Sequence, residues 1–367
     1  DLNIGTQQVV EIARALLSDA RLVIMDEPTS SLSRTDTEAL FAVIRRLAAS
    51  GIAVVYISHF LEEITQIADR VTVLRDGETV KTAPMADLTL EDIVRLMVGR
   101  ELAEMFPRTP HDIGDPILTV RNLSGRTTPT AVDITLHHGE ILGIAGLVGS
   151  GRSETIRALF GLHPTRDGTA TIRGCNVTVT ALSPASALAR GLDLLSENRK
   201  EEGLATALSV AFNTCMSSFH DLATWGLLSS HRERQAATTW CEALAIRCHD
   251  PAIPVGQLSG GNQQKVALAR ILHHDSDVLF LDEPTRGIDV GSKAEICRLI
   301  GALAAKGKAV IVVSSYLPEL LGVCDTLAVM YRGALSPARP VAEWNQDSLM
   351  LFASSGRLKL AENSTHG

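Results

Sequence analysis

Short apolar runs alternate with amphipathic stretches along most of the chain. The apolar runs are typical of strands buried on both faces of a parallel sheet, and they are bounded by turn residues. They predict strands at residues 22–25, 52–57, 69–74, 117–120, 134–136, 140–145, 169–172, 192–195, 278–281 and 309–314. Apolar residues at helical spacing predict helices at residues 9–17, 37–49, 88–97 and 154–160, and a mostly helical insert at 204–255. This alternation indicates an α/β fold.

The beginning of the chain repeats near its end without a gap. An offset of 256 residues places Gly5 on Gly261 and Asp26-Glu27-Pro28-Thr29 on Asp282-Glu283-Pro284-Thr285. The same offset aligns Ser58 with Ser314, Asp69 with Asp325 and Gly77 with Gly333. A constant offset over this span indicates that one fold occurs twice.

Proline and glycine interrupt the regular pattern between the two copies. Residues 106–116 contain Phe106-Pro107-Arg108-Thr109-Pro110 and Gly114-Asp115-Pro116, which predict a linker. The expected organisation is therefore a first domain at 1–105, a linker at 106–116, a second domain at 117–345 and a tail at 346–367. We expect this tail to fray, because it becomes polar towards its end.

Composition excludes several classes of protein. The chain has 367 residues, of which 45% are hydrophobic and 21% charged, as in globular proteins. Its net charge of −8 argues against nucleic acid as a partner. No apolar run reaches the ~18 residues of a membrane span. Six cysteines without CxxC spacing indicate reduced thiols.

A glycine-rich segment follows the predicted strand 140–145 and precedes the predicted helix 154–160. Its glycines would let backbone N–H groups converge on phosphate oxygens, and the helix N-terminus adds its dipole. The residues predicted to bind nucleotide phosphates are Gly146, Gly149, Ser150, Gly151, Arg152 and Ser153. The spacing is that of a phosphate loop and not the GxGxxG of dehydrogenases. Arg152 replaces the usual lysine, and its planar, longer side chain predicts poor γ-phosphate geometry.

Two adjacent acids, Asp282 and Glu283, follow the predicted strand 278–281. The carboxyl ends of parallel strands are where α/β sheets bind ligands. One acid can hold Mg²⁺ and the other can polarise an attacking water. Asp26 and Glu27 occupy the equivalent place in the first copy.

The segment Leu258-Ser259-Gly260-Gly261-Asn262-Gln263-Gln264 opens the helix before these acids. Together with the acids it resembles the signature and Walker B motifs of ABC-transporter ATPases. The resemblance covers nearly the whole chain. It implies tandem P-loop NTPase domains of the ABC type, each a mostly parallel sheet with a helical subdomain, and it makes residues 1–105 the C-terminal part of the first domain.

The resemblance also implies roles for individual residues, with ATP and Mg²⁺ as cofactors. Glu27 and Glu283 would act on the attacking water and His59 on the γ-phosphate. The residues implied to support Mg²⁺ are Ser153, Asp282 and Asp26. Further nucleotide contacts are implied for Leu258, Ser259, Gly260, Gly261, Gln263 and Gly5.

Several positions depart from the family pattern. Ser315 stands where the second copy would carry the counterpart of His59, and Glu197 stands near the usual Q-loop glutamine. Residues 124–133 contain no aromatic side chain to stack on adenine. In the first signature, Asn3 and Ile4 replace a serine and a glycine.

The family pairs its ATPase domains head to tail, so each ATP lies between one phosphate loop and the other domain's signature. The altered phosphate loop would then face the altered signature at residues 2–6. The intact signature at 258–261 would face Asp26, Glu27 and His59. This arrangement is that of an asymmetric ATPase with one working site.

Three further segments look like the corresponding segments in the ATPases of bacterial importers of ribose, galactose and xylose. They are the run Asn198-Arg199-Lys200-Glu201-Glu202-Gly203, Met97-Val98-Gly99-Arg100 and Phe106-Pro107. This resemblance implies the energy-coupling ATPase of a monosaccharide importer, peripheral on the cytoplasmic face of the inner membrane. Its partners would be two permease chains and, indirectly, a periplasmic sugar-binding protein.

Two alternatives stay open at this point. One is a soluble tandem ABC protein acting on ribosomes or DNA, which the short linker and negative charge disfavour. The other is a non-catalytic remnant. The first copy's phosphate loop would precede Asp1, so we expect an N-terminally truncated chain that alone hydrolyses ATP poorly or not at all.

Overall fold

The computed structural model describes most of the chain as two compact units. The described residues are 10, 14, 20–29, 34–58, 61–75, 77–98, 106–224, 227–288 and 290–356. One unit comprises Asp1–Met105 with Asp289–Gly291, and the other comprises Phe106–Ile288 with Ser292–Gly367. The predicted helix at 9–17 lies almost wholly outside the described residues, as do Gly5, His59 and the first signature.

The first unit contains two small pairs of strands and the helices that flank them. Its elements are β1 (Leu22–Asp26), α2 (Arg34–Ala49), β2 (Ala53–Ile57), α3 (Leu61–Ile67), β3 (Arg70–Arg75), β4 (Glu78–Pro84), η1 (Met85–Asp87) and α4 (Leu90–Val98). Strands β1 and β2 are parallel, and β3 and β4 are antiparallel. Val23 and Met25 of β1 pack on Phe41 and Ile44 of α2, so this helix buries the alternate residues of the strand.

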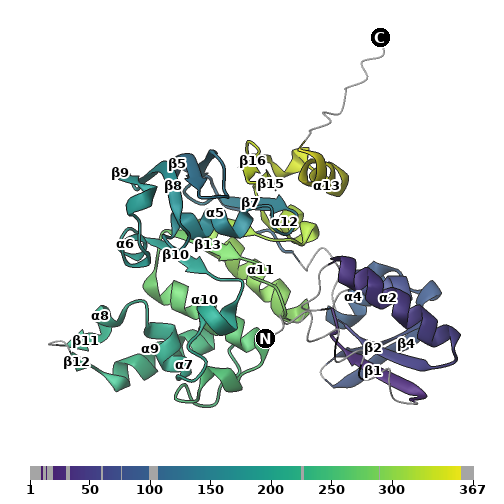
Figure 1. Cartoon of the computed structure of the whole chain (residues 1–367). Helices are drawn as coiled ribbons and strands as arrows, with labels where there is room; N and C mark the ends of the chain where they lie inside the picture. Colours follow the sequence, from purple (N-terminus) through teal and green to yellow (C-terminus); the bar gives the residue numbers. More distant parts are fainter. Residues whose placement is uncertain are drawn as a thin grey trace, which may run out of the picture. The chain divides into compact units, whose positions relative to one another are not determined.

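A mixed sheet of seven strands organises the second unit (Figure 1). Its strands are β10 (Leu192–Leu195), β13 (Val278–Asp282), β14 (Ala309–Val313), β7 (Ile141–Gly146), β15 (Thr326–Tyr331), β16 (Ala334–Leu335) and β17 (Arg339–Pro340). The first five lie side by side in this order and are parallel. Strands β16 and β17 both pair with β15 in antiparallel fashion.

Both faces of this sheet are covered. Leu279 and Leu281 of β13 belong to one apolar core, and Val278 and Phe280 belong to the core on the other face. A strand buried on both faces needs a continuous apolar run, which is why the four residues 278–281 are all apolar. The carboxyl ends of β7 and β13 therefore meet at one edge, where polar residues begin.

A second sheet and the helices complete this unit. The second sheet is antiparallel, with β6 (Val132–His137), β5 (Pro116–Gly125), β8 (Thr165–Ile172) and β9 (Cys175–Thr178) in that order. The helices are α5 (Arg152–Leu159), α6 (Pro184–Leu188), α7 (Val210–Cys215), α8 (Phe219–Leu222), α9 (Ser230–Ala243), α10 (Gly260–His274), α11 (Val290–Ala305), α12 (Leu317–Val323) and α13 (Gln346–Ser355). Short turns are η3 (Val179–Ala181), η4 (Arg199–Gly203), η5 (Val255–Gln257) and η6 (Val341–Glu343), and β11 (Ala223–Thr224) with β12 (Leu227–Leu228) forms a small hairpin.

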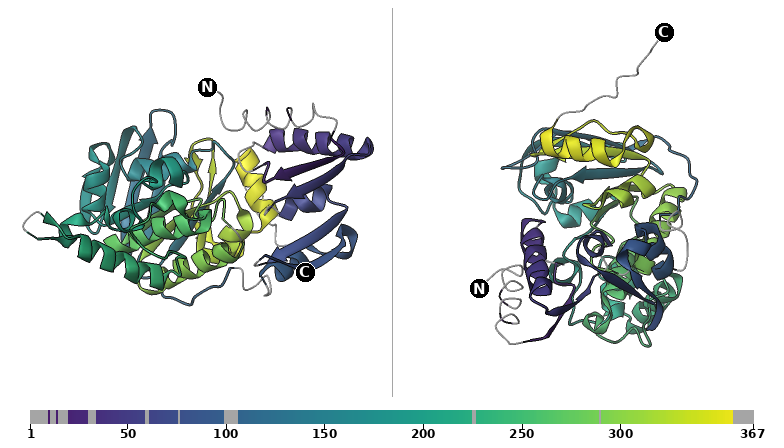
Figure 2. Two further views of the ribbon diagram at one scale, coloured as in Figure 1. Left: turned by 90° about the horizontal axis from the view of Figure 1, so that it is seen from below. Right: turned by 90° about the vertical axis from the view of Figure 1, so that its right-hand side faces the viewer.

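The prediction that the tail frays is wrong for residues 346–355. They form α13, which packs against β7 and β15 and is the yellow helix of Figure 2. Asn345 starts the helix with a capping box, and Leu349 is fully buried beneath it. The remaining residues of the predicted tail, 357–367, lie outside the described residues.

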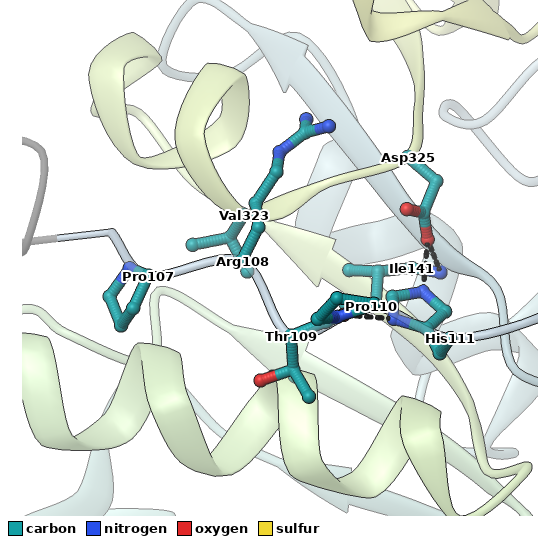
Figure 3. A pocket seen from close by; sticks show the side chains of 9 residues that line it. Pro107, Arg108, Thr109, Pro110, His111, Ile141, Val323 and Asp325 are labelled. Atoms are coloured by element: carbon teal, nitrogen blue, oxygen red, sulfur yellow. Dashed lines mark hydrogen bonds and ion pairs between the residues drawn. The ribbon is translucent and has the colours of Figure 1, made fainter.

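The predicted linker is irregular but packed onto the second unit. The Arg108 guanidinium donates to the carbonyls of Gly322 and Cys324 at 3.1 and 2.6 Å, which caps the C-terminus of α12. Beside it, a pocket of about 280 Å³ is lined by Thr109, His111 and Asp325 among others (Figure 3). His111 Nε2 lies 3.0 Å from Asp325 Oδ2, and Nδ1 lies 2.7 Å from the Thr109 carbonyl oxygen.

This histidine predicts a pH-dependent stability. Burial lowers the pKa of His111, but its bonds to Asp325 and to the Thr109 carbonyl outweigh burial, so the net pKa is raised. A pKa above the unfolded value of ~6.5 gives a stabilisation that is complete below that pH and lost as pH rises through the folded pKa. His111→Asn should therefore cost about 1–3 kcal/mol of unfolding free energy at pH 5.5 and less at pH 9.

Urea denaturation of both proteins at the two pH values measures this difference. The exposed His249 offers a matched control, His249→Asn, which should cost little at either pH. An equal cost of His111→Asn at pH 5.5 and pH 9 would contradict the assigned ion pair.

Candidate nucleotide site

The predicted phosphate loop connects β7 to α5, at the carboxyl edge of the central sheet. Gly146, Gly149 and Gly151 all have positive φ, of 152°, 76° and 107°. A Cβ on Gly146 would lie 2.6 Å from the Met330 carbonyl oxygen, so this position tolerates no side chain. Ser150 is buried, and its Oγ has no hydrogen-bond partner among the described atoms. A loop of this shape with an unsatisfied hydroxyl fits a phosphate group.

Ser153 and Asp282 meet across the sheet edge. The Ser153 hydroxyl, in the first turn of α5, donates to Asp282 Oδ1 at 3.0 Å. Burial raises the pKa of Asp282 to about 6, against the Ser153 hydrogen bond and the charge of Arg152. A hydroxyl and a carboxylate at this separation are the hard oxygen ligands that Mg²⁺ uses beside nucleotide phosphates. The described residues thus fit a Mg²⁺ ion at this point.

Arg152 turns away from the loop and towards the acids. Its Nη1 donates to the Ser314 carbonyl at 2.7 Å, and its Nη2 lies 3.6 Å from Glu283 Oε1. Both side chains are more than nine-tenths buried. Burial raises the pKa of Glu283 to about 7, although the Arg152 charge acts in the opposite direction. The guanidinium therefore neutralises the acid that the sequence predicts to activate water.

Ser315 completes this cluster. Its hydroxyl donates to Glu283 Oε2 at 3.2 Å, from the position that corresponds to His59 in the first copy. Glu283 is thus engaged by Arg152 on one oxygen and by Ser315 on the other. The structure brings together Arg152, Ser153, Asp282, Glu283 and Ser315.

The first unit holds its acids in a similar local frame. Asp26 ends β1, and the Glu27 N–H donates to the Ile57 carbonyl of β2 at 2.8 Å. In the second unit the Glu283 N–H donates to Val313 of β14 at the same distance. His59 and Gly5, the other predicted contacts of this half, lie outside the described residues.

The signature segment forms the N-terminus of α10. Ser259 is the N-cap, and Gln263 Nε2 donates to the Leu258 carbonyl at 2.9 Å. Gly260 begins the helix and Gly261 is buried within its first turn. The N-terminus of a helix, where the first N–H groups have no partner within the helix, suits an anion. Gln264 Nε2 joins this helix to the acidic turn by donating to the Pro284 carbonyl at 2.8 Å.

The segment after β10 contacts α5 and the loop that follows the acidic turn, which the sequence did not reveal. Arg199 donates to the carbonyls of Arg286 and Gly287 at 3.0 and 3.2 Å. Glu197 forms an ion pair with Arg286, and Glu202 one with Arg157 of α5. The charge pattern of residues 197–203 was the available signal, but pattern alone does not name the partners.

This fold and this site define a P-loop nucleotide-binding protein. The phosphate loop lies between the central strand β7 and helix α5. Asp282 and Glu283 lie at the carboxyl end of β13, and β14 separates β13 from β7. Comparison with known proteins narrows the class. The family model described as ABC transporter matches residues 130–286.

Two curated relatives extend the match beyond this segment. A putative ribose/galactose/methyl galactoside import ATP-binding protein of Agrobacterium fabrum is 44% identical over 354 residues, covering 96% of this chain and 70% of that protein. A xylose import ATP-binding protein of Burkholderia ambifaria is 46% identical over 338 residues, covering 90% of this chain and 65% of that protein.

Solved structures agree on the fold. A nucleotide-free ATP-binding cassette from an ABC transporter superposes with a TM-score of 0.53 at 21% identity, covering 62% of this chain and 92% of that one. The ADP conformation of another such cassette gives 0.52 at 21% identity, covering 66% and 96%. The chain belongs to the family of ABC-transporter ATP-binding proteins, of the monosaccharide-importer type, which are ATP hydrolases.

Proposed function

We propose that the chain is the energy-coupling subunit of a bacterial monosaccharide importer, in which Mg-ATP binding and hydrolysis drive uptake. The identity of more than two-fifths to import ATP-binding proteins supports the transport role. Those relatives are named for import, which favours this reading over a protein that acts on ribosomes or DNA. The observation that carries the ATP role is the bond between Ser153 and Asp282 beneath the phosphate loop.

The residues of the second unit divide the work at its nucleotide site. The backbone of Gly149, Ser150 and Gly151 would hold the phosphates, and Ser153 with Asp282 would hold Mg²⁺. A bound Mg²⁺ neutralises phosphate charge and orients the terminal phosphate. Glu283 is poorly placed to accept a proton from water while Arg152 and Ser315 engage both of its oxygens. This site therefore binds ATP and hydrolyses it slowly.

The first unit would supply the acids of the working site. Glu27 would act on water and Asp26 would support Mg²⁺, with His59 at the γ-phosphate. Gly5, in the altered signature, would instead face the phosphate loop of the second unit. Leu258, Ser259, Gly260, Gly261 and Gln263 would contact the same nucleotide from the second unit's signature. This pairing rests on the head-to-tail arrangement of the family.

The partners would be membrane permease chains on the cytoplasmic face of the inner membrane, with a periplasmic sugar-binding protein acting through them. Among the described helices, none combines the length and hydropathy needed to cross a membrane. We propose no nucleic-acid partner, since the net charge is −8.

Sugar uptake by cells that carry single substitutions at the two acids tests this function. Glu27→Gln should lower uptake of labelled ribose, galactose or xylose roughly 100-fold or more, because a lost catalytic base typically costs 10²–10⁴ in rate. Glu283→Gln, the matched control at the other site, should lower uptake only a few-fold, because that acid is already neutralised.

Uptake of all three sugars that is unchanged by Glu27→Gln, in cells that make the protein at its normal level, would contradict the proposal. Equal losses from Glu27→Gln and Glu283→Gln would contradict the asymmetry between the sites and leave the transport role standing.

A further inference from the structure

A buried glutamate lies behind the acidic turn of the second unit. Glu319, in the first turn of α12, is 1% exposed. Its Oε2 accepts a hydrogen bond from the Ser314 hydroxyl at 2.6 Å. Burial raises the pKa of this carboxyl, and side-chain hydrogen bonds from Ser314 and Thr285 act against it. Thr285, itself buried, lies two residues after Glu283.

The first unit contains the same arrangement. Glu63 Oε2 accepts from the hydroxyls of Thr29 at 2.9 Å and Ser58 at 3.0 Å. The offset of 256 residues aligns Thr29, Ser58 and Glu63 with Thr285, Ser314 and Glu319. Tyr56 adds a third hydroxyl to Glu63 at 2.7 Å, where the second copy has Val312. The pattern of threonine, serine and glutamate thus occurs behind both acidic turns.

The backbone of these turns needs such support. Glu27 and Glu283 adopt left-handed conformations, with φ of 45° and 47°. This region costs a residue with a Cβ roughly 1–2 kcal/mol, and such strain persists only where surrounding contacts impose it. In each unit the N–H of the glutamate, Glu27 or Glu283, donates to a carbonyl of the neighbouring strand. In the second unit, Gln264 also donates to the Pro284 carbonyl. In the first unit, the Glu63 carboxylate accepts a hydrogen bond from Thr29, the residue after the proline of the turn.

A purely structural explanation does not require a carboxylate here. A buried carboxyl group costs free energy unless it is hydrogen-bonded, and an apolar residue of similar size would fill the same space without that cost. The carboxylate differs from an apolar residue in accepting hydrogen bonds from hydroxyls. Glu63 accepts from two at once, Thr29 in the acidic turn and Ser58 at the end of the neighbouring strand, and Glu319 accepts from Ser314 at the equivalent strand end.

We propose that Glu319 and Glu63 are positioning residues that fix the left-handed acidic turn of their own unit by accepting hydrogen bonds from the threonine and serine on either side of it. Each glutamate thereby sets where the two acids of its turn point. In the second unit this places Asp282 beside Ser153, so the proposal rests on the proposed Mg-ATP site.

The test compares the affinity of the whole chain for ATP with Mg²⁺ and with EDTA, by displacement of a fluorescent ATP analogue. Glu319→Ala should reduce the enhancement of ATP affinity by Mg²⁺ about tenfold, in the range that residues behind a metal ligand contribute. Affinity in EDTA should stay within about twofold, because the phosphate loop does not contact Glu319. Glu319→Gln, which keeps one acceptor oxygen, should retain most of the enhancement.

Thermal unfolding of each variant separates positioning from folding. Thr285→Val should reproduce the effect of Glu319→Ala, and the double variant should lose no more than either single one. Glu242→Ala, on the exposed face of α9, is the matched control and should change neither affinity.

Variants of Glu319 and Thr285 that lower the melting temperature but keep the full Mg²⁺ enhancement would overturn the positioning role. If Glu319→Ala does not fold, the ratio of ATP affinity in Mg²⁺ to that in EDTA is measured for Glu319→Gln and Thr285→Val instead. An unchanged ratio in Thr285→Val would then overturn the positioning role. A wild-type chain that binds no ATP in either condition would instead contradict the proposed function, and the positioning role with it.

Discussion

Asp282→Ala is expected to lower the affinity of the chain for Mg-ATP roughly 10–100-fold while affinity for ATP in EDTA changes little. The carboxylate lies 3.0 Å from the Ser153 hydroxyl and is 2% exposed. Without it, Mg²⁺ would keep the serine and the phosphates as ligands but lose the carboxylate beside that serine. The phosphate loop itself would be unchanged, so binding that does not depend on the metal should persist.

The same fluorescent displacement assay measures this effect. Asp347→Ala, an exposed acid in the first turn of α13, is the control for removing a carboxylate from the unit. Equal losses of affinity with Mg²⁺ and with EDTA would show that Asp282 supports the fold of the loop and not the metal. No loss in either condition would contradict the assigned site.

Arg152→Met should lower the free energy of unfolding by about 3 kcal/mol, because it leaves Glu283 buried without its counter-charge. The guanidinium also satisfies the Ser314 carbonyl, which would lose a charged donor. The measurement belongs at pH 8.5, since the pKa of Glu283 is raised to about 7 and its carboxyl is ionised above that. At pH 6 the carboxyl can take up a proton, and the cost should shrink.

A double-mutant cycle isolates the pair. Arg152→Met combined with Glu283→Gln should recover part of the lost stability at pH 8.5, because the buried charge is gone. Arg339→Met is the control, since its ion pair with Glu343 spans 3.9 Å and both side chains are at least one-third exposed. Additive costs in the cycle would mean that Arg152 and Glu283 do not interact in solution.

The strands and the phosphate loop were predictable from the sequence because their signals are local. The apolar run at 278–281 fixes β13, and glycines between a strand and a helix fix the loop at 146–153. The internal repeat then identified Asp26 and Glu27 as the counterparts of Asp282 and Glu283. By contrast, the strands β4 and β9 contain few apolar residues, and α13 shows its apolar face only once Leu349 is seen packed on the sheet.

The direction of individual side chains could not be predicted in this way. The sequence shows that Arg152 replaces a lysine, but its hydrogen bond to the Ser314 carbonyl joins positions 162 residues apart. No sequence pattern pointed to Glu319, because an isolated glutamate in a helix normally faces solvent. Its role is visible from the repeat only after the contacts of Glu63 and Glu319 are compared.

We propose that the second unit's phosphate loop holds Mg-ATP while the acids of the same unit hydrolyse it slowly. The most direct test incubates the purified chain with labelled ATP and Mg²⁺, separates the protein, and identifies the bound nucleotide over time. We expect bound label to be recovered mainly as ATP after several minutes. Absence of bound nucleotide, or steady release of ADP at about 1 s⁻¹ or faster, as in an ordinary enzyme, would contradict the claim.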